Sequence, residues 1–174
     1  IINISIFKNS YLKKYKMKDK IGIVIPCYRE KGNIKKVIED IFSVFEYSED
    51  IYDFNIYLID DCCPDKSWKE VKKKENIIIF HNYKNMGVGG ACIEGFKKAL
   101  QDKCDLIIKM DADGQHNASY LIDLISFLLK IDRNKLVMLK GSRYLWPELA
   151  NNTPLNRRMG SLLLEPMIRS SLNY

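Results

Sequence analysis

The sequence predicts an α/β fold, in which a mostly parallel sheet carries helices on both faces. Two observations lead to this class. Short apolar runs alternate with segments of helical periodicity from residue 21 onward, which is the order of β-α-β connections. Each apolar run is hydrophobic throughout, without the polar alternation of a half-exposed strand, as expected for strands covered on both sides.

Five strands are predicted from the apolar runs. The first run, IGIVI, ends at Pro26, and the second, FNIYLI, stops at the pair Asp60-Asp61. The remaining runs are NIIIF, DLIIKM and LVMLKG. The predicted strands therefore cover residues 21–25, 54–59, 76–80, 105–110 and 136–141.

Helices are predicted in the segments between these strands. Apolar residues recur at helical spacing over residues 34–45, and Asn33 is a suitable N-cap. Ser67 and Glu70 match a capping box, which predicts a short lysine-rich helix. The two later helices are expected over residues 91–100, after a glycine-rich turn, and over residues 120–130.

The charge distribution argues against a nucleic-acid-binding protein. The formal net charge is +6, of which residues 8–20 supply +5 and residues 157–174 supply +2. Residues 21–156 are therefore close to neutral, and no basic face is expected on the body of the protein. The lysine run is interpreted as a solvated basic arm, and the alternative is a contact with anionic lipid.

Cysteine content and hydropathy indicate a cytoplasmic protein. Five cysteines are present, an odd number without a C-x-x-C pair, so neither a disulfide framework nor a zinc site is expected. No apolar run reaches the length of about 18 residues that indicates a membrane span. The segment INISIF is too short and too polar for a signal peptide. We therefore expect the cytoplasm, or the cytoplasmic face of a membrane.

Polar residues follow every predicted strand. The carboxyl ends of parallel strands meet at one edge of a sheet, and ligands of open α/β sheets bind there. The five loops expected at this edge are PCYRE, DDCCPD, HNYKNMGVGG, DADGQH and GSRY. They predict one binding site assembled from all five.

Asp111 and Asp113 carry the clearest chemical signal. They follow a buried strand, where two close carboxylates repel each other unless a positive charge lies between them. Mg²⁺ or Mn²⁺ prefers oxygen ligands and keeps positions open for phosphate oxygens. Gln115 adds a neutral oxygen, whereas His116 either ligates, faces solvent or caps the next helix. The alternative is an acidic loop without a metal.

The glycine-rich turn at residues 87–90 matches neither common phosphate-binding motif. Gly87 and Gly89 are followed by Cys92 where a dinucleotide fingerprint needs a third glycine, and the Lys-Ser/Thr ending of a Walker loop is absent. The turn either brings backbone N–H groups to a ligand or lets a helix pack closely.

Several side chains in the other loops suit a nucleotide. Tyr28 could stack on a base, and Glu30 could accept hydrogen bonds from a base or a ribose. Asp61 could accept a base N–H, while Asp60 braces the turn. Arg143 is a natural phosphate ligand because its guanidinium group binds two oxygens at once. Taken singly, each of these residues would more often be structural.

Five motifs in order, IPCYREKGNI, IDDCCPD, NMGVGGA, MDADGQH and KGSRY, resemble the inverting family 2 glycosyltransferases with the GT-A fold. The last two look most like the branch that moves a sugar to a polyprenyl phosphate, of the dolichyl-phosphate mannose synthase type. The resemblance covers residues 21–161. It implies a GT-A domain there, preceded by the basic arm 1–20, with residues 162–174 as a truncated part of the same domain.

The resemblance also implies residue roles. The nucleoside pocket would contain Pro26, Tyr28, Glu30, Ile59 and Asp61, with Gly87 in the donor site. Asp111, Ala112 and Asp113 would lie along the ribose and diphosphate, with Asp111, Asp113 and Gln115 as metal ligands. Arg143, Arg157 and Ser161 would bind phosphate or the acceptor's charge, and Asp113 and Arg143 would be the catalytic pair.

The implied activity is inverting transfer from a UDP- or GDP-linked sugar, assisted by Mg²⁺ or Mn²⁺, to a polyprenyl phosphate or a growing surface glycan. Two departures stand out: Cys62-Cys63 replaces a small residue of the family, and no late acidic segment that would carry a catalytic base precedes Tyr174. The base is therefore expected beyond residue 174. The alternatives are a sugar-phosphate nucleotidyltransferase and a non-catalytic module that binds a nucleotide sugar.

Overall fold

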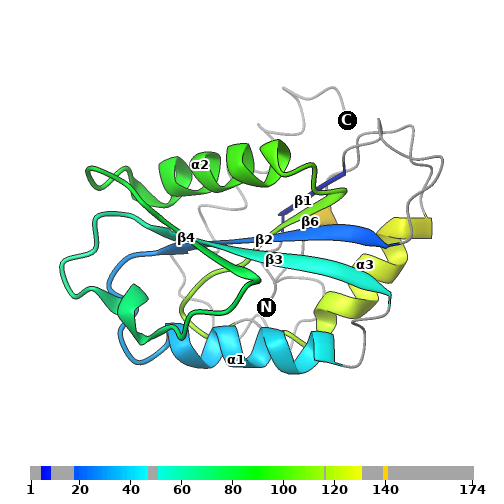
Figure 1. The fold of residues 1–174 in the computed structure, drawn as a ribbon, viewed down its shortest axis with the longest axis horizontal. Helices are drawn as coiled ribbons and strands as arrows, with labels where there is room; N and C mark the ends of the chain where they lie inside the picture. The colour runs from blue at the N-terminus through cyan, green and yellow to red at the C-terminus, as the bar shows by residue number, and fades with distance from the viewer. Residues whose placement is uncertain (1–4, 9–17, 47–50, 116, 131–138, 141–174) are drawn as a thin grey trace, which may run out of the picture. The chain divides into compact units, whose positions relative to one another are not determined.

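A six-stranded sheet with the order β4-β3-β2-β5-β1-β6 forms the centre of the fold (Figure 1). The structure is a computed structural model that describes residues 5–8, 18–46, 51–115, 117–130 and 139–140. The strands are β1 (Ser5–Lys8), β2 (Asp19–Cys27), β3 (Tyr52–Asp60), β4 (Ile77–His81), β5 (Leu106–Lys109) and β6 (Leu139–Lys140).

Strands β2, β3, β4 and β5 run parallel, as their apolar sequences predict. Ile23 of β2 pairs with Ile56 of β3 on one side and with Ile108 of β5 on the other. All three side chains are fully buried, which is why these strands are hydrophobic throughout.

Helices cover both faces of the sheet, so the predicted α/β class and layer arrangement are confirmed. Helices α1 (Ile34–Phe45) and α3 (Tyr120–Lys130) lie on one face, and α2 (Gly87–Gln101) lies on the other (Figure 1). Phe45 of α1 stacks on Phe54 of β3 with ring centroids 4.3 Å apart, which joins this helix to the core below the sheet.

Helix α2 approaches the sheet closely because its buried face consists of small residues. Ala91, Gly95 and Ala99 recur every four residues and are buried. A Cβ atom at Gly95 would lie 3.2 Å from Ile59 of β3 and would collide with Val24 of β2. This close packing occurs at Gly95, outside the predicted turn at residues 87–90, where a Cβ atom at Gly87 or Gly89 would meet no atom within 4 Å.

Part of the predicted basic arm 1–20 belongs to the sheet. Residues 5–8 form β1, which pairs antiparallel with both β5 and β6, and residues 19–20 begin β2. A strand fits here because β5 has an edge whose backbone N–H and C=O groups need partners. Residues 9–17, which hold three of the six lysines of the run, lie outside the described residues.

Ser67 does not cap a helix, so the predicted capping box is wrong. Residues Ser67–Glu70 form a single 3₁₀ turn preceded by Lys66, which has a left-handed φ of 53°. The Ser67 side chain is fully buried and bonds to two cysteines instead. Asn33 does occupy the N-cap position of α1, but its side chain donates to Glu30 Oε2 at 3.1 Å and makes no capping bond.

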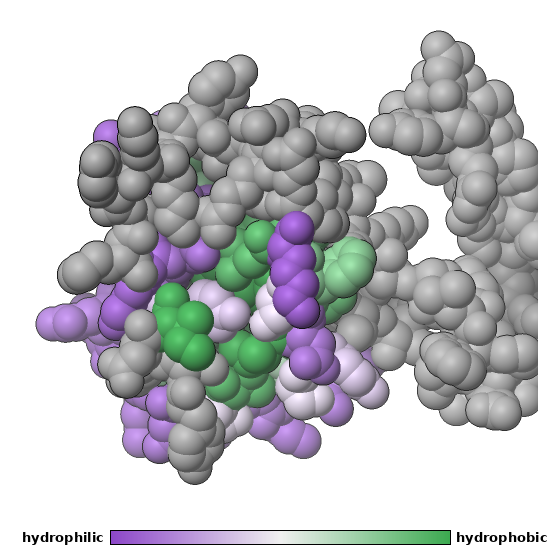
Figure 2. All heavy atoms as spheres, turned by 90° about the vertical axis from the view of Figure 1, so that its right-hand side faces the viewer, coloured by the Kyte–Doolittle hydropathy of each residue, from purple (hydrophilic) through white to green (hydrophobic). Residues whose placement is uncertain are grey.

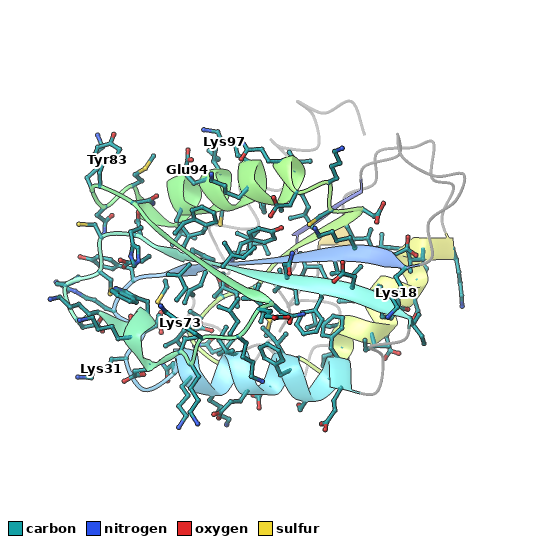
Figure 3. All side chains as sticks on the ribbon, in the orientation of Figure 1. Lys18, Lys31, Lys73, Tyr83, Glu94 and Lys97 are labelled. Carbon is teal, nitrogen blue, oxygen red and sulfur yellow. The ribbon has the colours of Figure 1, made fainter. Side chains whose placement is uncertain are left out.

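The carboxyl ends of the parallel strands lie at the left of Figure 1, and Lys31 and Tyr83 mark this end in Figure 3. Figure 2 shows the opposite end, where apolar side chains gather in the middle with hydrophilic ones around them. Within the described ranges, no helix has both the length and the hydropathy needed to cross a bilayer.

Candidate functional site

A cavity of about 200 Å³ lies at the carboxyl ends of the parallel strands. It contains seven of the residues predicted for the site, contributed by the loops after β2, β3 and β5. The lining residues are Pro26, Cys27, Tyr28, Glu30, Asp61, Val88, Ala91, Asp111, Ala112 and Asp113. The structure thus brings together side chains that are up to 87 positions apart, between Pro26 and Asp113.

The lining of this cavity is strongly acidic. Glu30, Asp61, Asp111 and Asp113 contribute four carboxylates, and no lysine or arginine of the described residues lines it. Carboxylates that lie close together raise each other's energy unless a cation lies among them, so a cavity lined by four of them favours a cation. The carboxylates are oxygen donors, which fit Mg²⁺ or Mn²⁺.

Asp111 and Asp113 differ in their surroundings. Asp111 forms an ion pair with Lys109, whose side chain is only 13% exposed at the end of β5. Asp113 accepts the backbone N–H of Gln115 through Oδ1 at 3.0 Å, which tightens the turn around Gly114. Gln115 itself is exposed and does not line the cavity.

Two of the three predicted metal ligands, Asp111 and Asp113, therefore reach the cavity together. Among the residues that the structure describes, no three His, Cys, Asp or Glu side chains converge on one point. A cation at this position would take its remaining ligands from a bound diphosphate or from water, as Mg²⁺ commonly does. His116 lies outside the described residues.

Asp61 is 2% exposed and anchors the segment before α2. Its Oδ1 accepts from Asn82 Nδ2 at 2.7 Å and from the Met86 backbone N–H at 2.9 Å, and its Oδ2 is 3.1 Å from the same N–H. These bonds explain how a buried carboxylate is tolerated at the cavity wall. They also place Val88 and Ala91, the next turn of the chain, beside the same cavity.

Asp60 braces the turn after β3, as expected. Its Oδ1 accepts the backbone N–H of Cys63 at 2.9 Å, and its Oδ2 lies 2.8 Å from His81 Nδ1. The His81 ring in turn contacts Trp68 edge to face, with ring centroids 4.5 Å apart. The turn is therefore tied to both β4 and the 3₁₀ turn.

Tyr28 and Glu30 form the wall contributed by the loop after β2. Tyr28 is 38% exposed, with the Arg29 guanidinium 5.3 Å from its ring centroid. Glu30 holds the side chain of Asn33 through Oε2 and lines the cavity. Both side chains are therefore accessible to a ligand.

Three lining residues were not predicted: Cys27, Val88 and Ala91. Burial raises the pKa of the Cys27 thiol to about 12. This thiol is neutral at physiological pH and acts as an apolar wall. A signal existed for Cys27 and Val88, since each stands at a strand or helix end beside a predicted site residue.

Other predicted site residues are placed elsewhere. Ile59 is fully buried in the core beneath α2, next to Val24 and Tyr57, and its side chain does not line the cavity. Gly87 begins α2 with a φ of 72°, and its N–H donates to Asn85 Oδ1 at 3.0 Å. Arg143, Arg157 and Ser161 lie outside the described residues.

A larger hollow of about 490 Å³ lies between α1 and residues 71–77. None of the predicted site residues lines it. Its wall includes Phe42 with the Lys74 ammonium 3.6 Å from the ring centroid, which places a charged side chain directly over its main aromatic surface. The acidic cavity at the strand ends is therefore the better candidate site.

Residues 22–171 match the family model described as glycosyl transferase family 2. The chain belongs to this family. The GT-A fold expected from the sequence motifs is thereby confirmed, and the acidic cavity of this family 2 chain lies where the motifs place a donor site.

Three characterised relatives are similar to this family 2 chain. The UDP-N-acetylglucosamine–dolichyl-phosphate N-acetylglucosaminyltransferase of Methanococcus voltae is 31% identical over 163 residues, which cover 84% of this chain and 61% of the relative. The dolichol-phosphate mannosyltransferase of Pyrococcus furiosus is 29% identical over 143 residues, covering 80% of this chain and 38% of the relative. The undecaprenyl-phosphate mannosyltransferase of Micrococcus luteus is 28% identical over 156 residues, covering 86% and 60%. This chain thus spans 38% to 61% of their lengths.

Proposed function

We propose that this chain forms the donor-binding domain of a glycosyltransferase that moves a sugar from a UDP- or GDP-linked donor to a polyprenyl phosphate. The observation that carries the proposal is the acidic cavity, where Tyr28 and Glu30 face the Asp111–Asp113 pair. The names of the relatives include dolichyl, dolichol and undecaprenyl phosphate, which favours a lipid phosphate over a growing surface glycan as acceptor.

Each part of the cavity wall suits one part of such a donor. The Tyr28 ring offers a stacking surface for the base. Glu30 offers carboxylate oxygens to base or ribose donors. Asp61 has two partners on Oδ1 and one on Oδ2, so Oδ2 retains an acceptor position for a base N–H.

The diphosphate would lie along Asp111, Ala112 and Asp113. Asp111 and Asp113 would hold a divalent cation, Mg²⁺ or Mn²⁺. When bound, the cation would stabilise the negative charge that develops on the departing nucleoside diphosphate. Asp113 is fixed for this role by the Gln115 N–H, and Arg143 is proposed as the phosphate ligand from the part of the chain outside the described residues.

The acceptor phosphate oxygen would attack the anomeric carbon from the face opposite the leaving group, and this attack inverts the configuration. A phosphate acceptor is already anionic, so the reaction does not depend on a strong base. We place the reaction at the cytoplasmic face of a membrane, because a polyprenyl chain partitions into the bilayer. The +5 charge of residues 8–20 would favour an anionic lipid surface by about 1 kcal/mol per lysine.

The hydrogen bonding of the loop after β2 argues against a sugar-phosphate nucleotidyltransferase. Such an enzyme would bind phosphates with the backbone of this loop. Here the N–H groups of residues 29–32 are all bonded to side chains of residues 63–70.

The other alternative is a non-catalytic module that binds a nucleotide sugar. Turnover of a lipid phosphate acceptor would distinguish the glycosyltransferase from such a module.

Calorimetric titration of UDP and GDP, with and without Mn²⁺, tests the donor site. We expect one nucleotide to bind about tenfold more tightly with Mn²⁺, and Asp113→Ala to abolish that gain. Asp123→Ala, a change of an exposed acid in α3, is the matched control and should behave as the parent. Equal affinity with and without metal, or an Asp113→Ala variant that binds like the parent, would refute the proposal.

A further inference from the structure

The loop that follows β2 is held by an unusual set of hydrogen bonds. The backbone N–H groups of four consecutive residues each donate to a side chain of one other loop. Arg29 donates to Cys63 Sγ at 2.9 Å, Glu30 to Ser67 Oγ at 3.4 Å, Lys31 to Asp65 Oδ2 at 3.3 Å and Gly32 to Glu70 Oε2 at 2.8 Å.

The acceptors form one connected network. Cys63 donates its proton to Asp65 Oδ1 at 2.6 Å, and this bond is the main reason that the pKa of Asp65 is lowered. Ser67 Oγ lies 3.3 Å from both Cys63 Sγ and Cys27 Sγ. Because the Cys63 proton is already used, the Ser67 hydroxyl donates to Cys63 and accepts from Cys27 and Glu30. Every donor in this chain of bonds then has an acceptor.

Both loops have strained backbone at this contact. Arg29 has a φ of 60°, and Cys62 and Lys66 have φ values of 56° and 53°. Left-handed geometry costs a non-glycine residue about 1–3 kcal/mol and persists only where surrounding interactions impose it. Such strain is common beside ligand sites, and here it lies next to Tyr28 and Glu30, which line the acidic cavity.

We propose that Cys63, Asp65, Ser67 and Glu70 are positioning residues that hold the loop of residues 28–32 in the shape that binds the donor nucleotide. This inference rests on the proposed function, which assigns Tyr28 and Glu30 to the nucleoside. The backbone N–H groups of residues 29–32 all point toward residues 63–70, so the loop is already ordered before a nucleotide binds. Nucleotide binding therefore costs less conformational entropy.

Cys63, one of the two adjacent cysteines, thereby gains a role that the sequence did not suggest. Cys63 is 6% exposed and serves as both acceptor and donor within the network. Serine can make the same two bonds, with a shorter reach, whereas alanine can make neither. Comparison of Cys63→Ala with Cys63→Ser therefore separates the effect of the lost hydrogen bonds from the effect of the lost side-chain volume.

The test measures two quantities on the full chain: amide hydrogen exchange of residues 29–32 without nucleotide, and the Kd of UDP and GDP with Mn²⁺. We expect Cys63→Ala and Ser67→Ala to speed exchange at these amides and to raise the nucleotide Kd about tenfold. Cys63→Ser should stay within about threefold of the parent Kd. Glu70→Gln, a milder change at the surface, should speed exchange mainly at Gly32.

Cys104→Ala is the matched control, since Cys104 is a cysteine 1% exposed that bonds to Tyr57 away from the cavity. It should lower stability without changing the Kd or the exchange of residues 29–32. Unchanged exchange in the Cys63 and Ser67 variants would overturn the inference, as would faster exchange with an unchanged Kd. If the parent binds neither nucleotide, the donor proposal fails together with this role, and the exchange data then show separately whether the loop is held.

Discussion

The carboxylate of Asp61 holds the backbone N–H of Met86 between its two oxygens, at 2.9 and 3.1 Å. This contact links the end of β3 to the start of α2, two elements separated along the chain by β4. Asp61 is 2% exposed and lies in the wall of the acidic cavity. A residue predicted to recognise a base thus also sets the shape of the site.

Replacing Asp61 with asparagine should lower both stability and nucleotide affinity. The new amide group would direct N–H donors at the Met86 N–H or the Asn82 side chain and leave a buried donor without an acceptor. We expect a loss of about 1–3 kcal/mol in the free energy of unfolding, measured by denaturant titration. Asp53→Asn, an exposed change on β3, is the control and should cost no more than about 0.5 kcal/mol. A fully stable Asp61→Asn protein would contradict the bracing role.

Two glycines of α2 should respond oppositely to alanine. Gly95→Ala would force a methyl group against Val24 and Ile59, and we expect a loss of about 1–3 kcal/mol through overpacking. Gly89→Ala meets no atom within 4 Å and should gain about 0.5–1 kcal/mol from helix propensity. Thermal and denaturant unfolding of both variants would measure the change in the free energy of unfolding. Two losses of similar size would show that the helix lies differently on the sheet.

Removing the Lys109 charge should strengthen divalent-cation binding. Lys109 pairs with Asp111 and so competes with a cation for that carboxylate. We expect Lys109→Met to bind Mn²⁺ at least about threefold more tightly in the absence of nucleotide, by electron paramagnetic resonance titration. Lys97→Met removes a lysine that pairs with Glu94 on the outer face of α2 and should leave the affinity unchanged (Figure 3). Equal affinities of Lys109→Met and parent would show that the ion pair does not compete.

Thiol labelling should follow exposure and pKa. An alkylating reagent reacts with the thiolate, and the pKa of about 12 keeps Cys27 almost fully protonated even at pH 9. Cys62 is exposed, so we expect it to react first and Cys27 to resist labelling until the protein unfolds. Mass spectrometry of labelled peptides at pH 7 and pH 9 would show this order. Rapid labelling of Cys27 in the folded protein would mean that the loop after β2 opens readily.

Much of the site could be predicted because its signals are local. Asp111 directly follows an apolar run, Asp113 and Tyr28 stand three residues after one, and parallel pairing brings the ends of such runs to one edge.

The features that escaped prediction depend on residues distant in sequence. Ser67 matches a local capping pattern, but its hydroxyl bonds to Cys27, 40 positions away. The sequence of β1 has no marked hydrophobic pattern, and the segment forms a strand because it pairs with β5, with Ile6 opposite Ile108. Ile59 precedes the paired aspartates as a site residue would, yet the close approach of α2 at Gly95 buries it. In each case a tertiary partner decides between two locally acceptable outcomes.

The pairing of β1 with β5 and β6 also sets an order of events during synthesis. The segment Ser5–Lys8 leaves the ribosome early, but its partners Leu106–Ile108 emerge much later. Until then the segment has no sheet to join, and the closure of so long a loop is entropically slow. We therefore expect β1 to join the sheet only after β5 has emerged. A shortened protein that lacks β1 would leave one side of β5 ready to pair with a neighbouring molecule.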